Sequence, residues 1–222
     1  MKKGEESRQR LIECAAKLFW KNGYSATGIS EILRQTDLPK GSFYFYFKSK
    51  DDLATAVTEY YQKILLEQFQ NSSQKNNWKS FIEEIFDFLS ERTNGQTFAG
   101  CPYAVMGMET ALSKPAVASV FMEGLKKFEQ IFQEVLLCSG LSPDHAKILS
   151  QRMLSIYQGY FLLGRISADT SYLKNAKKNM IEMYREYRSF QSLIGLLNYS
   201  VRLQRYNNYL NNAIPVRRKN TG

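Results

Sequence analysis

The stretch from residue 27 to 53 constrains the fold of this chain more than any other part of the sequence. It reads TGISEILRQTDLPKGSFYFYFKSKDDL. Ile29 and Ile32 are three positions apart and share one face of a helix of about two turns. Asp37 tolerates the left-handed backbone conformation, and Pro39 suits the first turn of a helix. The stretch therefore predicts two short helices that are joined by a tight turn.

The second of these helices is predicted to combine a buried face with a face that can approach an anion. Lys40, Gly41 and Ser42 open it with a cation, a residue without a side chain and a small hydroxyl. Backbone amides at a helix start, together with the helix dipole, can bind phosphate oxygens. Phe43 and Phe47 are four positions apart and can both face a hydrophobic core. The helix start is therefore a candidate phosphate contact.

Two tyrosines and a following helix extend this candidate surface. Tyr44 and Tyr46 fall on other faces than the phenylalanines, so their hydroxyls stay free for phosphates or base edges. Ser49, with Asp52 three positions later, forms a capping box that predicts the start of a long helix. Lys50 lies beside this start, where a cation and free backbone amides can hold a second phosphate.

The sequence PKGSFYFYF at residues 39–47, followed by KSKDDL at 48–53, resembles the recognition-helix signature of TetR/AcrR-type transcriptional regulators. The resemblance extends toward the N-terminus, because residues 8–27 are similar to the family's first helix and its exit turn. Asp37 stands where the family usually has Gly, and Tyr46 stands where His is frequent. We expect the first departure to be tolerated and the second to alter the preferred operator sequence.

This resemblance implies an all-α fold in three parts. A helix-turn-helix DNA-binding domain of three helices is expected over residues 1–48, a helical effector-binding and dimerisation domain over 49–188, and an extra C-terminal helix with a basic tail over 189–222. The expected partners are a second copy of the chain, a palindromic DNA operator and a small-molecule effector that releases the DNA. Repression is the commoner outcome in the family. The expected DNA contacts are Thr27, Lys40, Gly41, Ser42, Tyr44, Tyr46 and Lys50, with Ser42 and Tyr46 as candidates for base edges.

A dimer interface is expected in the C-terminal half of the chain. The segment from Pro143 to Ser167 has helical spacing and contains Gly159 and Gly164, where missing side chains permit close approach of another helix. A further helix is predicted after Thr170 or Ser171. These two helices could pair with their symmetry mates as a four-helix interface.

An effector pocket is predicted from the aromatic and sulfur-containing residues between the expected DNA-binding and dimerisation regions. An apolar or aromatic ligand would suit such a lining. The alternative is that these residues fill the hydrophobic core, as aromatic rings and methionines commonly do. The candidate lining residues are Tyr61, Phe86, Phe98, Cys101, Tyr103, Met106, Phe121, Met122, Phe128 and Tyr157.

Cys101 is the cysteine whose position suggests reactivity. It lies between Gly100 and Pro102 at an expected helix start, where the helix dipole could lower the pKa of the thiol. It could then sense oxidants or electrophilic effectors, although a structural role is the simpler interpretation. The three cysteines are widely spaced and odd in number, which suits reduced thiols.

The sequence does not indicate an enzyme. We find no phosphate-binding glycine loop, nucleophile elbow, metal-ligand spacing or convincing carboxylate pair, and we expect no cofactor and no metal. No apolar run is long enough for a membrane span and no secretory signal is present, so a cytoplasmic protein is expected. A helical ligand-binding or adaptor protein that does not use its DNA-binding motif is the alternative function.

The charge distribution leaves the role of the C-terminal end open. The formal net charge of +9 is compatible with nucleic acid binding, but cations and acids are nearly balanced over residues 1–60. The C-terminal end is more basic. The extra helix expected over residues 189–212 could pack on the dimer interface or over the effector pocket, and a solvated helix with a disordered basic end is the simpler interpretation.

Overall fold

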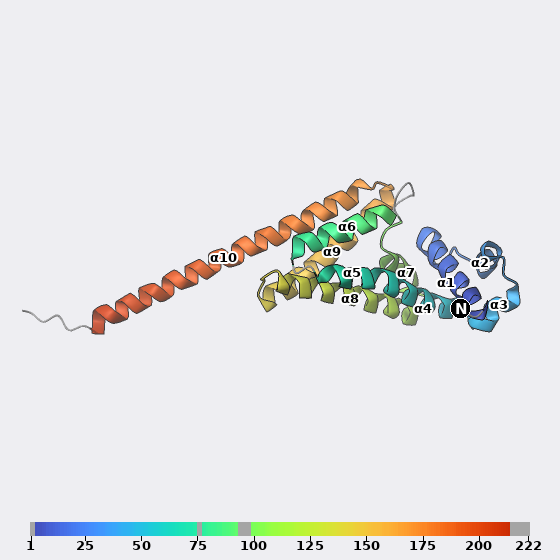
Figure 1. Ribbon diagram of the computed structural model, residues 1–222, viewed down its shortest axis with the longest axis horizontal. Coiled ribbons are helices and arrows are strands. Elements are labelled where there is room, and N and C mark those ends of the chain that lie inside the picture. Colours follow the sequence, from blue (N-terminus) through green and yellow to red (C-terminus); the bar gives the residue numbers. More distant parts are fainter. Residues whose placement is uncertain (1–2, 75–76, 93–98, 214–222) are drawn as a thin grey trace, which may run out of the picture. The chain divides into compact units, whose positions relative to one another are not determined.

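The computed structural model describes residues 3–74, 77–92 and 99–213, and every regular element in these ranges is a helix (Figure 1). The chain divides into two compact units, residues 1–181 and 182–222. The all-α fold class that we predicted is confirmed. None of the described helices is long and apolar enough to cross a membrane.

The first three helices form a small N-terminal bundle. Helix α1 (Lys3–Asn22) ends at a left-handed glycine, and α2 (Ile29–Thr36) and α3 (Lys40–Tyr46) follow. Leu11, Phe19, Ile32 and Phe43 are fully buried between them. Asp37 ends α2 with φ 51° and ψ 40°, and its backbone N–H bonds to the preceding helix. The predicted turn is therefore confirmed, with Asp37 in the left-handed conformation that the family's usual glycine adopts without strain.

The helix after this bundle is long but not uniform. It begins with α4 (Lys50–Tyr61), passes through the π-helical turn η1 (Gln62–Leu66) and continues as α5 (Glu67–Ser73). Its start carries the predicted capping box: the Ser49 hydroxyl oxygen accepts from the Asp52 amide at 3.1 Å, and the Asp52 carboxylate accepts from the Lys48 amide at 3.0 Å. The cap fixes where α4 leaves the bundle.

Four further helices complete the first unit, and aromatic rings fill its core. They are α6 (Trp78–Arg92), α7 (Pro102–Thr110), α8 (Pro115–Cys138) and α9 (Pro143–Ser167). The Phe69 and Phe128 ring centroids are 4.6 Å apart, and the Trp78 and Phe132 centroids are 5.5 Å apart. Because Trp78 also donates its indole N–H to the Met180 carbonyl at 2.9 Å, the aromatic core holds the start of the last helix.

The last helix differs from the expectation. We predicted one helix after Ser171 and a separate one over residues 189–212, but α10 runs without a break from Ser171 to Ala213. Gly195 lies inside it and does not end it, because a glycine in a helix costs only about 1 kcal/mol relative to alanine. Leu173 and Met180 near its start are buried, whereas the large apolar side chains after residue 189 are exposed.

Candidate DNA-binding surface and effector cavity

Helix α3 separates a buried face from an exposed one. Phe43 and Phe47 are buried as predicted, and Lys40 and Gly41 are exposed at the start of the helix. Tyr44 is 54% exposed. A Cβ atom at Gly41 would meet no other atom within 4 Å, so the backbone there is open to a close approach from outside. The start of α3 therefore offers a cation, free amides and a phenol on one accessible surface.

Three further residues of α3 complete this surface. Ser42 and Tyr46 are half-buried at its edge. Phe45 is 80% exposed, and its ring lies edge-on to Tyr46 with centroids 4.9 Å apart. The sequence analysis did not select Phe45, although the pairing of Phe43 with Phe47 already places it on another face. An exposed phenyl ring on a helix of this kind can contact a thymine methyl group.

Thr27 and Lys50 do not lie as predicted. Thr27 is fully buried, and its hydroxyl donates to the Gly23 carbonyl at 2.8 Å. The Lys50 ammonium donates to the carbonyls of Tyr24 at 2.9 Å and Thr27 at 3.1 Å, and it lies 4.2 Å from the Tyr24 ring centroid. Burial lowers the pKa of Lys50, although neighbouring carboxylates oppose this effect. The reason for the correction is that the turn after α1 leaves carbonyls that these side chains satisfy, so both residues support the turn.

An ionic cluster joins the same turn to the next helices. The Tyr24 hydroxyl donates to one Asp51 carboxylate oxygen, and the Lys114 ammonium lies 2.9 Å from the other. The backbone N–H of Ser25 donates to Glu109 at 3.0 Å. The hydrogen bond from Tyr24 and the contact with Lys114 lower the pKa of Asp51. Helices α7 and α8 are thereby tied to the turn that supports α3.

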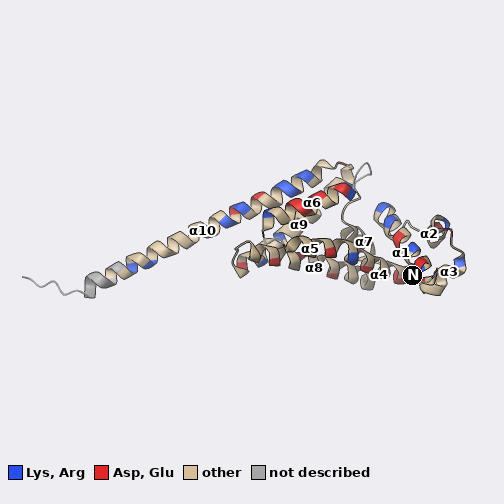
Figure 2. Ribbon diagram, viewed as in Figure 1, with Lys and Arg blue, Asp and Glu red and all other residues tan. Residues whose placement is uncertain are grey.

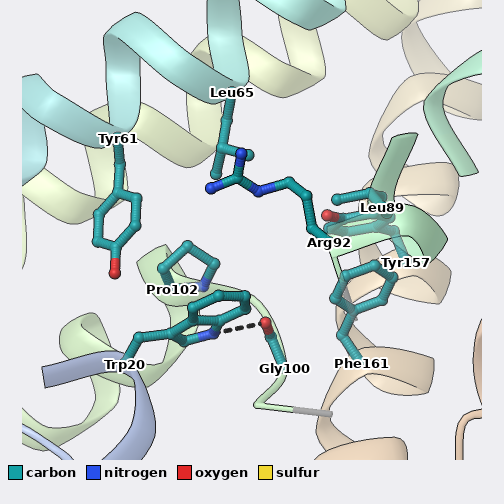
Figure 3. Close-up of a pocket in the computed structure, with 9 residues that line it drawn as sticks. All are labelled: Trp20, Tyr61, Leu65, Leu89, Arg92, Gly100, Pro102, Tyr157 and Phe161. Atoms are coloured by element: carbon teal, nitrogen blue, oxygen red, sulfur yellow. Dashed lines mark hydrogen bonds between the residues drawn. The ribbon is translucent and has the colours of Figure 1, made fainter. Parts of the chain in front are cut away.

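A cavity of about 450 Å³, including the part that is open to solvent, lies next to this junction (Figure 3). Its walls are almost entirely apolar, and Arg92 is the charged residue among those that line it. The Tyr157 and Phe161 rings are stacked with centroids 3.9 Å apart. The lining residues are Trp20, Tyr61, Leu65, Leu89, Arg92, Gly100, Pro102, Tyr157 and Phe161.

The prediction of the pocket lining was right for two residues, Tyr61 and Tyr157. Phe86 lies behind them, with its ring centroid 6.3 Å from that of Tyr157. Met122 is 47% exposed and lies outside the cavity. Phe98 falls outside the residues that the structure describes.

The other candidates belong to the core, which corrects the prediction for them. Tyr103, Met106, Phe121 and Phe128 are buried and do not line the cavity. The Tyr103 ring occupies the space that Gly124 leaves free, since a Cβ atom there would overlap the ring. These residues pack α7 against α8, and their helical spacing reports that packing.

Cys101 occupies the predicted place but lacks the predicted chemistry. It is the N-cap residue of α7, and it is 3% exposed. Burial raises the pKa of its thiol, despite hydrogen bonds from Gln158 and from nearby backbone amides. Desolvation of the thiolate outweighs the helix dipole here. The structure therefore contradicts the idea of a readily ionised sensor thiol at Cys101.

Helix α1 forms one wall of the cavity, which the sequence analysis missed. The indole N–H of Trp20 donates to the Gly100 carbonyl at 2.8 Å (Figure 3). Arg165 of α9 donates to the Trp20 carbonyl at 2.7 Å and also to the Ala99 carbonyl. The Tyr61 hydroxyl donates to the Ala16 carbonyl at 2.7 Å. The cavity therefore lies where the N-terminal bundle is fastened to the helices behind it.

Helix α9 also carries a separate apolar surface. Gly159 has no atom within 4 Å of a Cβ position, so the helix is open there. The exposed large apolar side chains of this helix are Ile148, Leu162, Leu163 and Ile166. This surface agrees with the predicted interface helix, and the dimer itself stays a prediction.

Two family models match most of the chain. Residues 11–57 match the model of bacterial regulatory proteins of the tetR family, and residues 78–179 match the C-terminal domain of LmrA/YxaF-like transcriptional regulators. The chain belongs to the TetR family. It is a DNA-binding transcriptional regulator of the helix-turn-helix type, and this agrees with our expectation that it is not an enzyme.

Relatives and solved structures agree with this assignment. The chain is 29% identical over 169 residues to the regulator YxaF of Bacillus subtilis strain 168, covering 74% of this chain and 87% of that protein. It is 23% identical to LmrA of the same strain over 71% of this chain and 86% of the relative. A TetR regulator from Legionella pneumophila has the same fold, with a TM-score of 0.72 and 19% identity over 78% of this chain and 95% of its own. The TetR-family helices thus account for most of this chain.

Proposed function

We propose that this TetR-family regulator is a cytoplasmic homodimeric repressor that reads a palindromic operator through α3. The observation that carries the proposal is the exposed face of that helix. Lys40, Gly41 and Tyr44 would contact phosphates, and Ser42, Tyr46 and Phe45 would contact base edges. One such helix covers few base pairs, so a two-fold dimer is needed to double the contacts, and the operator must repeat with the same symmetry.

We further propose that an apolar or aromatic effector occupies the cavity and releases the DNA. The stacked Tyr157 and Phe161 rings suit an aromatic body, and Arg92 suits an acceptor or anionic group on its edge. Trp20 supports the link to DNA binding, because it lines the cavity and belongs to α1. A ligand that displaces Trp20 would disturb the hydrogen bonds that fasten the N-terminal bundle. Ligands that favour the displaced state would shift the population toward it.

The test of operator reading is a selection with genomic fragments. The purified protein is incubated with fragments of its own genome at low and at physiological salt, and the retained DNA is sequenced. We expect a two-fold repeat that survives physiological salt, with an affinity that falls with salt by a log–log slope of about −0.9 per phosphate neutralised. Indiscriminate fragments that are lost at higher salt would contradict the proposal and favour an adaptor protein that does not use its DNA-binding motif.

The cavity can be tested with anilinonaphthalene sulfonate, an aromatic anion. The sequence has two tryptophans, Trp20 and Trp78, so a Trp78→Phe variant leaves Trp20 as the sole indole at the cavity wall. We expect dye binding to quench Trp20 emission, and Arg92→Met to weaken binding about tenfold, or about 1.4 kcal/mol. Lys79→Met removes a cation elsewhere on α6 and serves as the control. Equal dye affinity in both variants would contradict the proposed ligand class.

A further inference from the structure

The second unit of the chain carries a regular apolar seam along α10. The seam consists of Met183, Tyr187, Phe190, Ile194, Leu197 and Val201, which alternate in spacings of four and three residues. This is the seven-residue repeat by which paired helices bury a continuous stripe. Phe190 and Leu197 are each 57% exposed, so within the described residues no other element of this chain covers that part of the seam.

The same repeat begins inside the first unit. Leu173, Ala176 and Met180 precede the seam in the same spacing, and all three are buried in the core. The repeat therefore continues in register from residues that already pack against other helices to residues that pack against none. The family model of the C-terminal domain ends at residue 179, so the exposed seam lies beyond the part that the model matches.

Charges are kept away from the seam. No charged residue occurs between Arg188 and Arg202, and Figure 2 shows this stretch of α10 as uncoloured helix between basic residues. The charged residues of α10 from 182 to 206 all fall at other positions of the repeat. They are Glu182, Arg185, Glu186, Arg188, Arg202 and Arg205. A partner helix can therefore approach the whole seam without meeting a charge.

We propose that this seam pairs with the same seam of a second copy of the chain, as a parallel two-stranded coiled coil. The residue types favour this occupant over a lipid surface, which would require apolar residues but no particular order of them. Ile194 and Val201 are β-branched residues at the first core position, and Leu197 occupies the second, the combination that favours two parallel strands. Asn208 occupies the next first core position, where a single asparagine fixes register.

Disulfide trapping in the full-length chain tests the proposal. In a Cys138→Ser background, which removes the exposed native thiol, Val201→Cys places one thiol in the seam. Parallel pairing in register sets the two copies of residue 201 face to face, so we expect rapid formation of a covalent dimer under mild oxidation. Tyr199→Cys is the matched control, because residue 199 is more exposed but lies on the side opposite the seam. Absence of the Val201→Cys dimer, or equal rates for both variants, would overturn the proposal.

A second measurement does not depend on oxidation. Leu197→Asp should raise the dimer dissociation constant, measured by sedimentation, at least tenfold, whereas Tyr199→Asp should leave it unchanged. Both positions are exposed in α10, so neither change should unfold the core. An unchanged dissociation constant for Leu197→Asp, together with binding to phosphatidylserine vesicles that this variant loses, would assign the seam to lipid instead. Neither assay uses DNA, so the outcome is independent of the proposed operator binding.

Discussion

Replacement of both Lys40 and Tyr44 by alanine is expected to weaken binding to the selected operator by about 100-fold or more at physiological salt. Each side chain lies exposed at the start of α3 and would contribute about 1–2 kcal/mol per subunit, so a dimer loses four contacts. Fluorescence anisotropy with labelled operator measures the loss. Because a phosphate contact disappears, the dependence of affinity on salt should also become shallower.

The control for this change is Lys126→Ala, which removes an exposed cation on α8 outside the DNA-binding surface. It should leave operator affinity within about twofold, since a single distant charge acts weakly at this ionic strength. Both variants should retain the helical circular dichroism of the parent. If the double variant and the control bound alike, α3 would not be the reading element.

Arg165→Met is expected to lower the free energy of unfolding by about 2 kcal/mol and to loosen the end of α1. The guanidinium donates to carbonyls of Trp20, Lys21 and Ala99, and charge-assisted hydrogen bonds of this kind contribute more than neutral ones. Methionine preserves the length of the side chain and removes the donors. Hydrogen exchange measured by mass spectrometry should show faster exchange at residues 17–24 and 99–101, and urea unfolding gives the free energy.

Lys147→Met serves as the comparison, because it replaces an exposed cation on the same helix. Its exchange pattern and midpoint should match those of the parent. Unchanged protection of the end of α1 in Arg165→Met would mean that α9 does not hold the N-terminal bundle. The cavity would then need another connection to the DNA-binding surface.

The DNA-binding helices could be predicted because their determinants are local. The turn at Asp37, the capping box at Ser49 and the buried pair Phe43 and Phe47 each involve residues within four positions of one another. Spacing alone places such residues. The same is not true of Lys50, whose ammonium bonds to carbonyls 26 and 23 positions earlier in the chain. A cation beside a helix start was therefore interpreted as exposed when its partners were remote.

The cavity could not be predicted for a related reason. Its walls come from α1, α4, η1, α6, the start of α7 and α9, and helical spacing does not tell a core ring from a cavity ring. Tyr103 and Tyr157 have the same residue type and are both buried, yet only the second lines the cavity. Cys101 shows the same limit, because its helix position was predicted correctly while the burial that raises its pKa was not.

The π-helical turn η1 has a consequence for how this helix can change during evolution. A wider turn holds one residue more than an α-helical turn, and Leu65, a wall of the cavity, lies within it. Loss of one residue here would restore a regular helix and rotate everything after it by about 100°. Phe69 would then leave the aromatic core. Amino-acid replacements in this turn can be absorbed one at a time, but an insertion or deletion cannot, so the number of residues here is under stronger constraint than their identity.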